Sequence, residues 1–145
     1  MVFKVQIQGL RELQARFDQL PQELQREAKG YVAMGAQTWV RNAKRDAPID
    51  LGVLRNQISY VDMSKAGSIS YEVVSGARYS AYIEWGTITK VSVPGELAAY
   101  AMNFKGKGIR TNGGIIPRPF FFKQRAEAIK VVEQGLQSML KAIKL

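Results

Sequence analysis

The chain opens on a segment in which apolar and polar residues alternate. Phe3, Val5 and Ile7 share one side of this segment, and its polar residues share the other. A period of two residues is typical of a half-buried strand, so a strand is predicted over residues 2–8. Apolar residues then recur at helical spacing up to Pro21, which predicts a short amphipathic helix.

Two long helices are predicted from apolar positions spaced three and four residues apart. The first runs from about residue 22 to residue 45, and the second begins at Pro119. Gly30 and Gly35 lie inside the first helix, where each costs roughly 1 kcal/mol relative to alanine. We therefore expect both glycines to mark close packing, because a missing side chain lets another backbone approach. The face of the last helix that should be buried consists of Arg125, Ala128, Val132, Leu136, Met139 and Ile143.

Two further segments alternate with a period of two residues and predict an antiparallel hairpin. The first spans residues 53–63 and the second residues 69–74, with a turn at residues 66–68 between them. Residues 78–85 fit either a short helix or a strand. This order of elements predicts a single α+β domain over residues 1–145, in which a small antiparallel sheet packs against two long helices.

Residues 86–118 form the longest stretch without a periodic pattern. Six glycines and two prolines interrupt it, and loops of this length in a compact domain are commonly functional. The stretch holds five basic residues and one acidic residue, so its formal charge is 5 − 1 = +4, out of +9 for the whole chain. A long basic loop of this kind indicates contact with a polyanion or with an acidic protein surface.

Composition excludes several kinds of site. The chain has no cysteine and no histidine, so disulfides, thiolate metal sites and histidine-based catalysis are ruled out. A metal site would have to use carboxylates alone, and we expect no metal, no cofactor and no small-molecule substrate. No apolar run approaches the ~20 residues that span a bilayer, and the N-terminus does not resemble a signal peptide. We expect a protein that is made in a cytoplasm and contacts no membrane.

Glu84 is a carboxylate with apolar neighbours, because Ile83 and Trp85 flank it. A buried carboxyl group with a raised pKa can act as a general acid. Catalysis would need a partner group, and none stands at an informative spacing, so we expect that the protein is not an enzyme. We predict instead that Glu84 forms a buried ion pair with Arg55, which also has apolar neighbours.

Three other segments allow a functional and a structural interpretation. Residues 105–110 weakly resemble a phosphate-binding loop, but the full Gly-x-x-x-x-Gly-Lys-Ser/Thr pattern is missing. A flexible basic loop is therefore favoured over a nucleotide-binding site. Tyr79, Tyr82 and Trp85 could stack on bases of a single-stranded nucleic acid, although packing in the core or at a subunit interface is favoured. Three phenylalanines at residues 120–122 cannot all face one core from a helix. Either a neighbouring subunit covers one of them, or they are wedged between the sheet and the long helix.

Three short motifs follow one another along the chain. Ala-Pro-x-x-x-Gly-x-Leu-Arg spans residues 47–55, Tyr-x-x-Tyr-Ile-Glu-Trp-Gly-Thr spans residues 79–87, and Pro-Arg-Pro-Phe spans residues 117–120. Together they resemble the signature of a family of tail components from lambda-like long-tailed bacteriophages, the tail-completion or head–tail joining proteins. The resemblance covers about residues 9–140. Leu51 departs from it, because the family usually has Thr or Ser before the motif glycine.

The resemblance implies a structural virion protein without catalytic activity. Such a protein forms a ring, most simply a hexamer or a dodecamer, in the neck or upper tail, where it completes the tail and joins it to the head. A tail terminator that caps the tail tube is the alternative, and a non-specific DNA-binding protein is a second alternative. The motif residues, which we interpret as fold determinants, are Pro48, Gly52, Leu54, Arg55, Tyr79, Tyr82, Glu84, Gly86, Thr87 and Pro119.

The expected partners are further copies of the chain and other neck and tail proteins, and a non-specific contact with DNA in the channel is left open. The protein is expected to be made in the host bacterial cytoplasm and to reside in the virion. We assign the joining contacts to the basic loop and to the aromatic residues that follow it. The candidate interface residues are Lys90, Lys105, Lys107, Arg110, Arg118, Phe120 and Phe121.

Deletion of about residues 100–114 is therefore expected to leave the monomer folded and to block ring formation or head–tail joining. Circular dichroism checks the fold, and light scattering in the presence of the neck partners checks assembly. A truncated protein that still assembles normally would refute the assignment.

Overall fold

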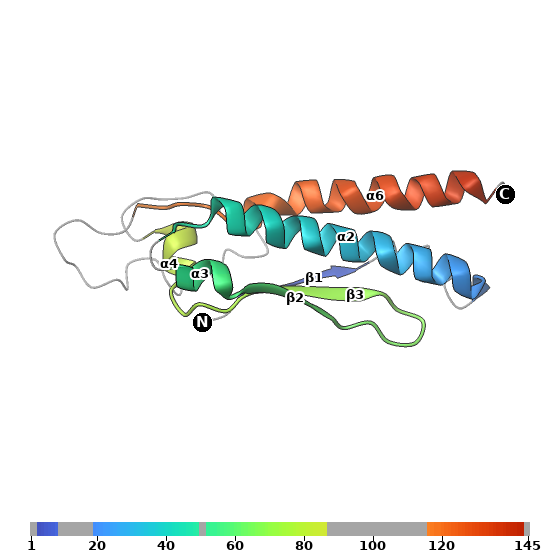
Figure 1. The fold of residues 1–145 in the computed structure, drawn as a ribbon, viewed down its shortest axis with the longest axis horizontal. Coiled ribbons are helices and arrows are strands. Elements are labelled where there is room, and N and C mark those ends of the chain that lie inside the picture. The colour runs from blue at the N-terminus through green and yellow to red at the C-terminus, as the bar shows by residue number, and fades with distance from the viewer. Residues whose placement is uncertain (1–2, 9–18, 50–51, 87–115, 144–145) are drawn as a thin grey trace.

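The fold consists of three layers: a small sheet, a long helix on one of its faces and a second long helix on the first (Figure 1). The computed structural model describes residues 3–8, 19–49, 52–86 and 116–143. The predicted α+β class is confirmed. In chain order the elements are β1 (Phe3–Gln8), α2 (Gln22–Asp46), α3 (Val53–Asn56), β2 (Ile58–Asp62), β3 (Ser70–Ser75), α4 (Ser80–Trp85), the 3-10 helix η4 (Phe122–Gln124) and α6 (Arg125–Ala142).

The sheet is antiparallel and has the strand order β1-β3-β2. The predicted hairpin is present, with Ile58 opposite Ser75 and Tyr60 opposite Val73. Its turn depends on Gly67, which has a φ of 73° that favours glycine. Of the two strands whose side-chain burial is described, the central strand β3 buries four residues and β2 buries only Ile58.

The predicted strand over residues 53–63 is wrong in its first part, because residues 53–56 form the helical turn α3. Gly52 begins this turn with a φ of 70°, and the amide of Gln57 donates to the carbonyl of Val53. Leu54 and Ile58 are both buried and lie four residues apart, which is also a helical spacing. The alternating pattern of residues 53–63 is therefore compatible with a helical turn over residues 53–56 followed by a shorter strand over residues 58–62.

The last helix also begins later than predicted. Residues 116–120 belong to no helix or strand, a turn of 3-10 helix follows, and α6 starts at Arg125 rather than at Pro119. Arg125 is exposed, so it does not belong to the buried face, and Ile143 is only partly buried, but the four predicted positions between them are confirmed. The buried residues of α6 are Ala128, Val132, Leu136 and Met139. The predicted short helix before Pro21 falls mostly on residues outside the described ranges.

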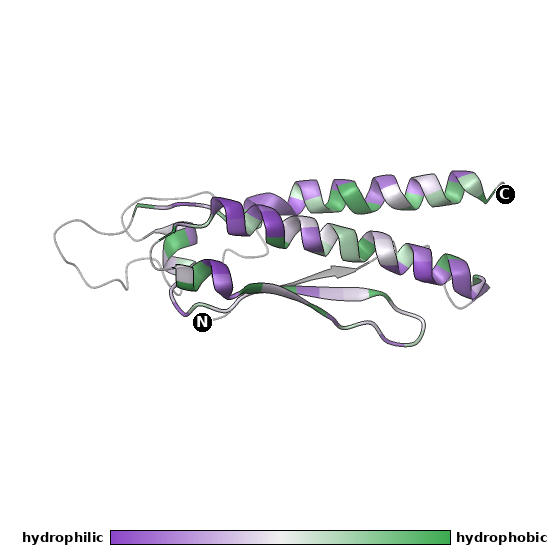
Figure 2. Ribbon diagram, viewed as in Figure 1, coloured by the Kyte–Doolittle hydropathy of each residue, from purple (hydrophilic) through white to green (hydrophobic). Residues whose placement is uncertain are grey.

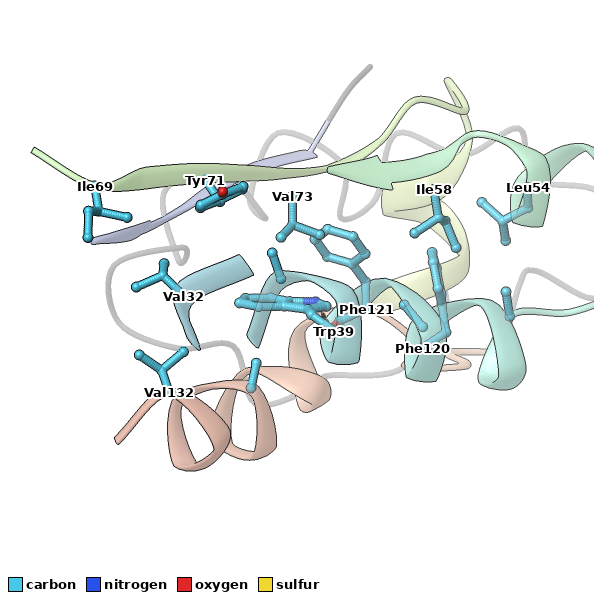
Figure 3. Packing of buried hydrophobic residues seen from close by; sticks show 14 of the residues in the cluster. Val32, Trp39, Leu54, Ile58, Ile69, Tyr71, Val73, Phe120, Phe121 and Val132 are labelled. Carbon is cyan, nitrogen blue, oxygen red and sulfur yellow. Dashed lines mark hydrogen bonds between the residues drawn. The ribbon is translucent and has the colours of Figure 1, made fainter. Parts of the chain in front are cut away.

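Both long helices are amphipathic, and Figure 2 shows hydrophilic and hydrophobic residues alternating along each of them. The apolar side of α6 packs on α2, and α2 packs on both α6 and the sheet. Figure 3 shows Val73 pointing from the sheet toward Trp39 of α2 and toward Phe121. The rings of Trp39 and Phe121 lie 5.6 Å apart between centroids. None of the described helices is long and apolar enough to span a membrane.

Gly35 is a position of close packing between the long helices, but Gly30 is not. A methyl group on Gly35 would overlap the Cγ2 atom of Val132 and would lie 3.0 Å from the carbonyl oxygen of Ala128. A methyl group on Gly30 would meet nothing within 4 Å. The packing prediction is therefore confirmed for Gly35 and wrong for Gly30.

We predict opposite effects for the two substitutions by alanine. Gly35→Ala should lower the free energy of unfolding by about 1–3 kcal/mol, because α6 must move away from α2. Gly30→Ala should raise it by up to about 1 kcal/mol through helix propensity. Urea titration of both variants measures the difference. Equal effects at the two sites would contradict the helix packing described above.

Candidate functional site

The carboxylate of Glu84 connects the second sequence motif to the third. Its Oε2 atom accepts hydrogen bonds from the backbone amides of Phe120 (2.8 Å) and Phe121 (3.0 Å), and its Oε1 atom accepts one from Phe122 (3.1 Å). Glu84 is only 3% exposed. We call this arrangement of Glu84 and the three amides the Glu84 clasp.

The electrostatics of the Glu84 clasp combine two opposing effects. Burial raises the pKa of the Glu84 carboxyl above its ordinary value, because water no longer solvates the charged form. The three amides, and more weakly Lys123, act in the opposite direction, since they stabilise the carboxylate. Consecutive backbone amides that point at one spot make a binding site for an anion, and here the anion is supplied by the chain itself.

Further contacts hold the residues around the Glu84 clasp in place. The amide of Arg118 donates to the carbonyl of Ile83 at 2.8 Å, and the indole of Trp39 donates to the carbonyl of Phe121 at 2.8 Å. The ring of Phe122 stacks on Trp85 with a centroid separation of 5.8 Å and an interplanar angle of 6°. The third motif is thus fixed by both backbone and aromatic contacts.

The predicted ion pair between Glu84 and Arg55 does not form. Arg55 donates instead to two backbone carbonyls, those of Ala47 (3.4 Å) and Arg45 (3.3 Å), at the end of α2. Both residues are described, and each has its hydrogen bonds elsewhere. The prediction was wrong because it considered only a charged side chain as the partner of Glu84. The actual partners are backbone amides, which nearly every residue has and which a sequence pattern therefore cannot single out.

A second polar cluster attaches the end of α2 to the start of the last helix. Asp46 accepts from Gln124 at 2.9 Å and forms ion pairs with Arg45 and Lys123, both at 2.8 Å. The adjacent Arg45, followed by Lys123 and Gln124, holds the pKa of the Asp46 carboxyl well below its usual range. The same Gln124 amide also donates to the carbonyl of Phe120 at 3.1 Å, which links this cluster to the Glu84 clasp.

The first motif makes the turn between α2 and α3. Ala47, which precedes Pro48, is extended with φ −65° and ψ 137°, as expected before a proline. The amide of Gly52 donates to the carbonyl of Ile49 at 3.1 Å. Leu54 is buried beside this turn.

The remaining motif residues lie around α4. Tyr82 is half-buried, Tyr79 is exposed and Pro119 is exposed. Gly86 ends α4 with a φ of 64°, and its amide donates to the carbonyl of Tyr82. Thr87 lies outside the described residues.

The predicted interface residues differ in their exposure to solvent. Phe120 and Phe121 are fully buried in the core of the chain, so neither is available as a surface contact. Arg118 is exposed. Phe120 belongs to no helix, and the 3-10 turn begins only at Phe122, so the rings of Phe120 and Phe121 are not restricted to the α-helical spacing on which the prediction was based. The other four candidates, Lys90, Lys105, Lys107 and Arg110, lie outside the described residues.

Four exposed apolar residues precede or belong to the segments around α3, α4 and the third motif, and of these only Tyr79 was considered in the sequence analysis. Ile49 precedes α3 and is 69% exposed, and Ile116 enters the third motif and is 66% exposed. Val53 and Tyr79 add smaller exposed areas. We call these four residues the end face. Within the described ranges, no acidic residues gather into a group that could hold a metal ion.

Comparison with known proteins identifies a related family. Residues 11–86, which are 76 of the 145 residues, match the model of a family described as "Bacteriophage HK97-gp10, putative tail-component". The match includes the first motif and the second as far as Gly86. No curated protein and no solved structure matches the chain. The resemblance drawn from the three motifs is thereby confirmed.

Removing the Glu84 carboxylate should be far more costly than removing the Arg55 guanidinium. Glu84→Ala leaves three amides without their acceptor, so we predict a loss of at least about 3 kcal/mol in the free energy of unfolding. Glu84→Gln should fall between Glu84→Ala and the unmodified protein, because it keeps one acceptor oxygen. Arg55→Ala should cost about 1 kcal/mol or less, since its two hydrogen bonds are long. Chemical denaturation checks the order, and equal costs for Glu84→Ala and Arg55→Ala would restore the ion-pair hypothesis.

Proposed function

The chain belongs to the HK97-gp10-like family of bacteriophage tail components, and from this premise we propose that it is a ring-forming subunit of the neck or upper tail. In this role it completes the tail and joins it to the head. The role is structural and not catalytic. The family match is the observation that carries the proposal, because it includes the first motif and the second motif as far as Gly86, and with them Glu84.

The Glu84 clasp supports the proposal by making a rigid base at the motif-bearing end. Residue 86 ends α4, and residues 116–118 return to it through the hydrogen bond between Arg118 and Ile83. Both ends of the basic segment 87–115 are therefore fixed to each other and to the core. A joining protein needs such a base, because contacts with a partner are weakened when their support must first be ordered.

The end face supports the proposal by offering apolar area next to this base. Exposed apolar residues form interaction sites when they lie together on a soluble protein, and we propose that these four residues do so. Arg118 is exposed in the same segment as Ile116, so the surface combines apolar and basic groups. We propose that the end face contacts the next subunit or a neck protein, and that head-to-tail contacts of this kind close a ring.

The end face is tested by the double substitution Ile49→Asp/Ile116→Asp. Both side chains are largely exposed, so stability should change by no more than about 0.5 kcal/mol per site. In a phage that depends on this gene, the variant should produce separate heads and tails, which electron microscopy would count. Ile129→Asp, on the exposed side of α6, is the matched control and should support normal particles.

Three outcomes would count against parts of the proposal. Normal particles from the double variant would remove the end face from the joining contact. Tails of uncontrolled length in the absence of the protein would indicate a terminator. Intact particles in its absence, together with salt-sensitive DNA binding by the pure monomer, would favour a DNA-binding protein.

A further inference from the structure

The side of α2 that faces away from the core carries a regular stripe of exposed residues. Its positions alternate in steps of four and three, which keeps them in one row along a helix. Met34, at the middle of the row, is 50% exposed. The stripe consists of Glu23, Glu27, Gly30, Met34, Gln37 and Arg41, all of them exposed. We call it the α2 stripe.

Among the residues that the structure describes, no close neighbour explains the presence of Gly30. It lies in the middle of a 25-residue helix, is exposed and would have open space around an added methyl group. Glycine at such a position weakens the helix without improving any contact inside the monomer. It does, however, leave room for another backbone to approach α2 closely at this point.

The α2 stripe is acidic at one end and basic at the other, so its charges are complementary to those of a second, antiparallel stripe. Glu23 and Glu27 lie at its N-terminal end, and Arg41 lies at its C-terminal end. Glu27 and Arg41 are each seven residues from Met34, so an antiparallel copy centred on Met34 brings Glu27 of each copy opposite Arg41 of the other. Within the described residues, Arg41 has no ionic partner, and Glu27 accepts only the hydroxyl of Tyr31.

We propose that the α2 stripe is a two-fold interface at which a second copy of this chain binds in antiparallel orientation. Met34 lies on the axis and meets Met34 of the second copy. Glu27 pairs with Arg41 on each side, and Gly30 lets the two helices approach. A parallel arrangement would place Glu27 against Glu27 and Arg41 against Arg41, so the charges select the antiparallel one.

This contact goes beyond the proposed ring. A two-fold contact uses the same surface on both copies and yields a closed dimer, whereas a ring requires two different surfaces. The end face and the α2 stripe lie on different elements. Loss of the dimer would therefore leave the ring proposal untouched, and failure of the ring would leave the dimer untouched.

Disulfide trapping tests the interface cleanly, because the chain has no cysteine of its own. Met34→Cys places two thiols at the axis within reach of each other, so mild oxidation should link most of the protein into dimers. Glu27→Cys and Arg41→Cys should each link poorly alone, since identical residues at these positions lie about 21 Å apart along the two helices. A mixture of the two variants should link efficiently. Ile129→Cys, exposed on α6, is the control and should stay monomeric.

Light scattering of uncrosslinked variants gives the second test. Glu27→Arg and Arg41→Glu should each weaken self-association at least tenfold, and the double variant Glu27→Arg/Arg41→Glu should restore it, because the swapped charges pair again. Gly30→Ala should weaken association at least tenfold while raising the melting temperature of the monomer. A Met34→Cys protein that links no faster than Ile129→Cys would overturn the proposal, as would a double variant that associates no better than the single ones.

Discussion

Three backbone amides that share one buried carboxylate determine how this chain closes on itself. Glu84 lies 36 to 38 residues before the amides of Phe120, Phe121 and Phe122 along the sequence, and its two oxygens accept all three. Without the carboxylate, the backbone of residues 120–122 would carry unsatisfied donors in an apolar environment, which is costly. With it, the same backbone can present Phe120 and Phe121 to the core. The packing of the aromatic residues thus depends on a polar interaction.

The rest of the fold is arranged around this point. Trp39 of α2 packs against Phe121 and donates to its carbonyl, so the longest helix is attached directly to the clasped segment. Gln124 reaches both Phe120 and Asp46, which connects the start of α6 with the end of α2. Gly35 then lets α6 lie close along α2 beyond this junction. Of the two long helices, α2 covers the sheet, and α6 packs on α2.

Periodicity predicted the elements whose residues pack by repetition. Ala128, Val132, Leu136 and Met139 form a helical stripe that is buried as expected, and the hairpin pairs in the expected region. Periodicity failed where a single contact decides the structure. Leu54 fits a strand and a helical turn equally well, and only the conformation of Gly52 selects the turn. The sequence placed Glu84 in apolar surroundings, but its partners are main-chain groups that every residue has. Gly30 and Gly35 look alike in the sequence, and they differ only in what lies opposite.

For a tail component, this organisation separates the parts that hold the fold from the parts that can meet partners. The central claim is that the Glu84 clasp makes the motif-bearing end a rigid base, and native-state hydrogen exchange of the Phe120, Phe121 and Phe122 amides tests it most directly. The account predicts that these three amides exchange as slowly as the core amides of α2, although they belong to neither an α-helix nor a strand. Exchange at the rate of freely exposed amides would contradict it.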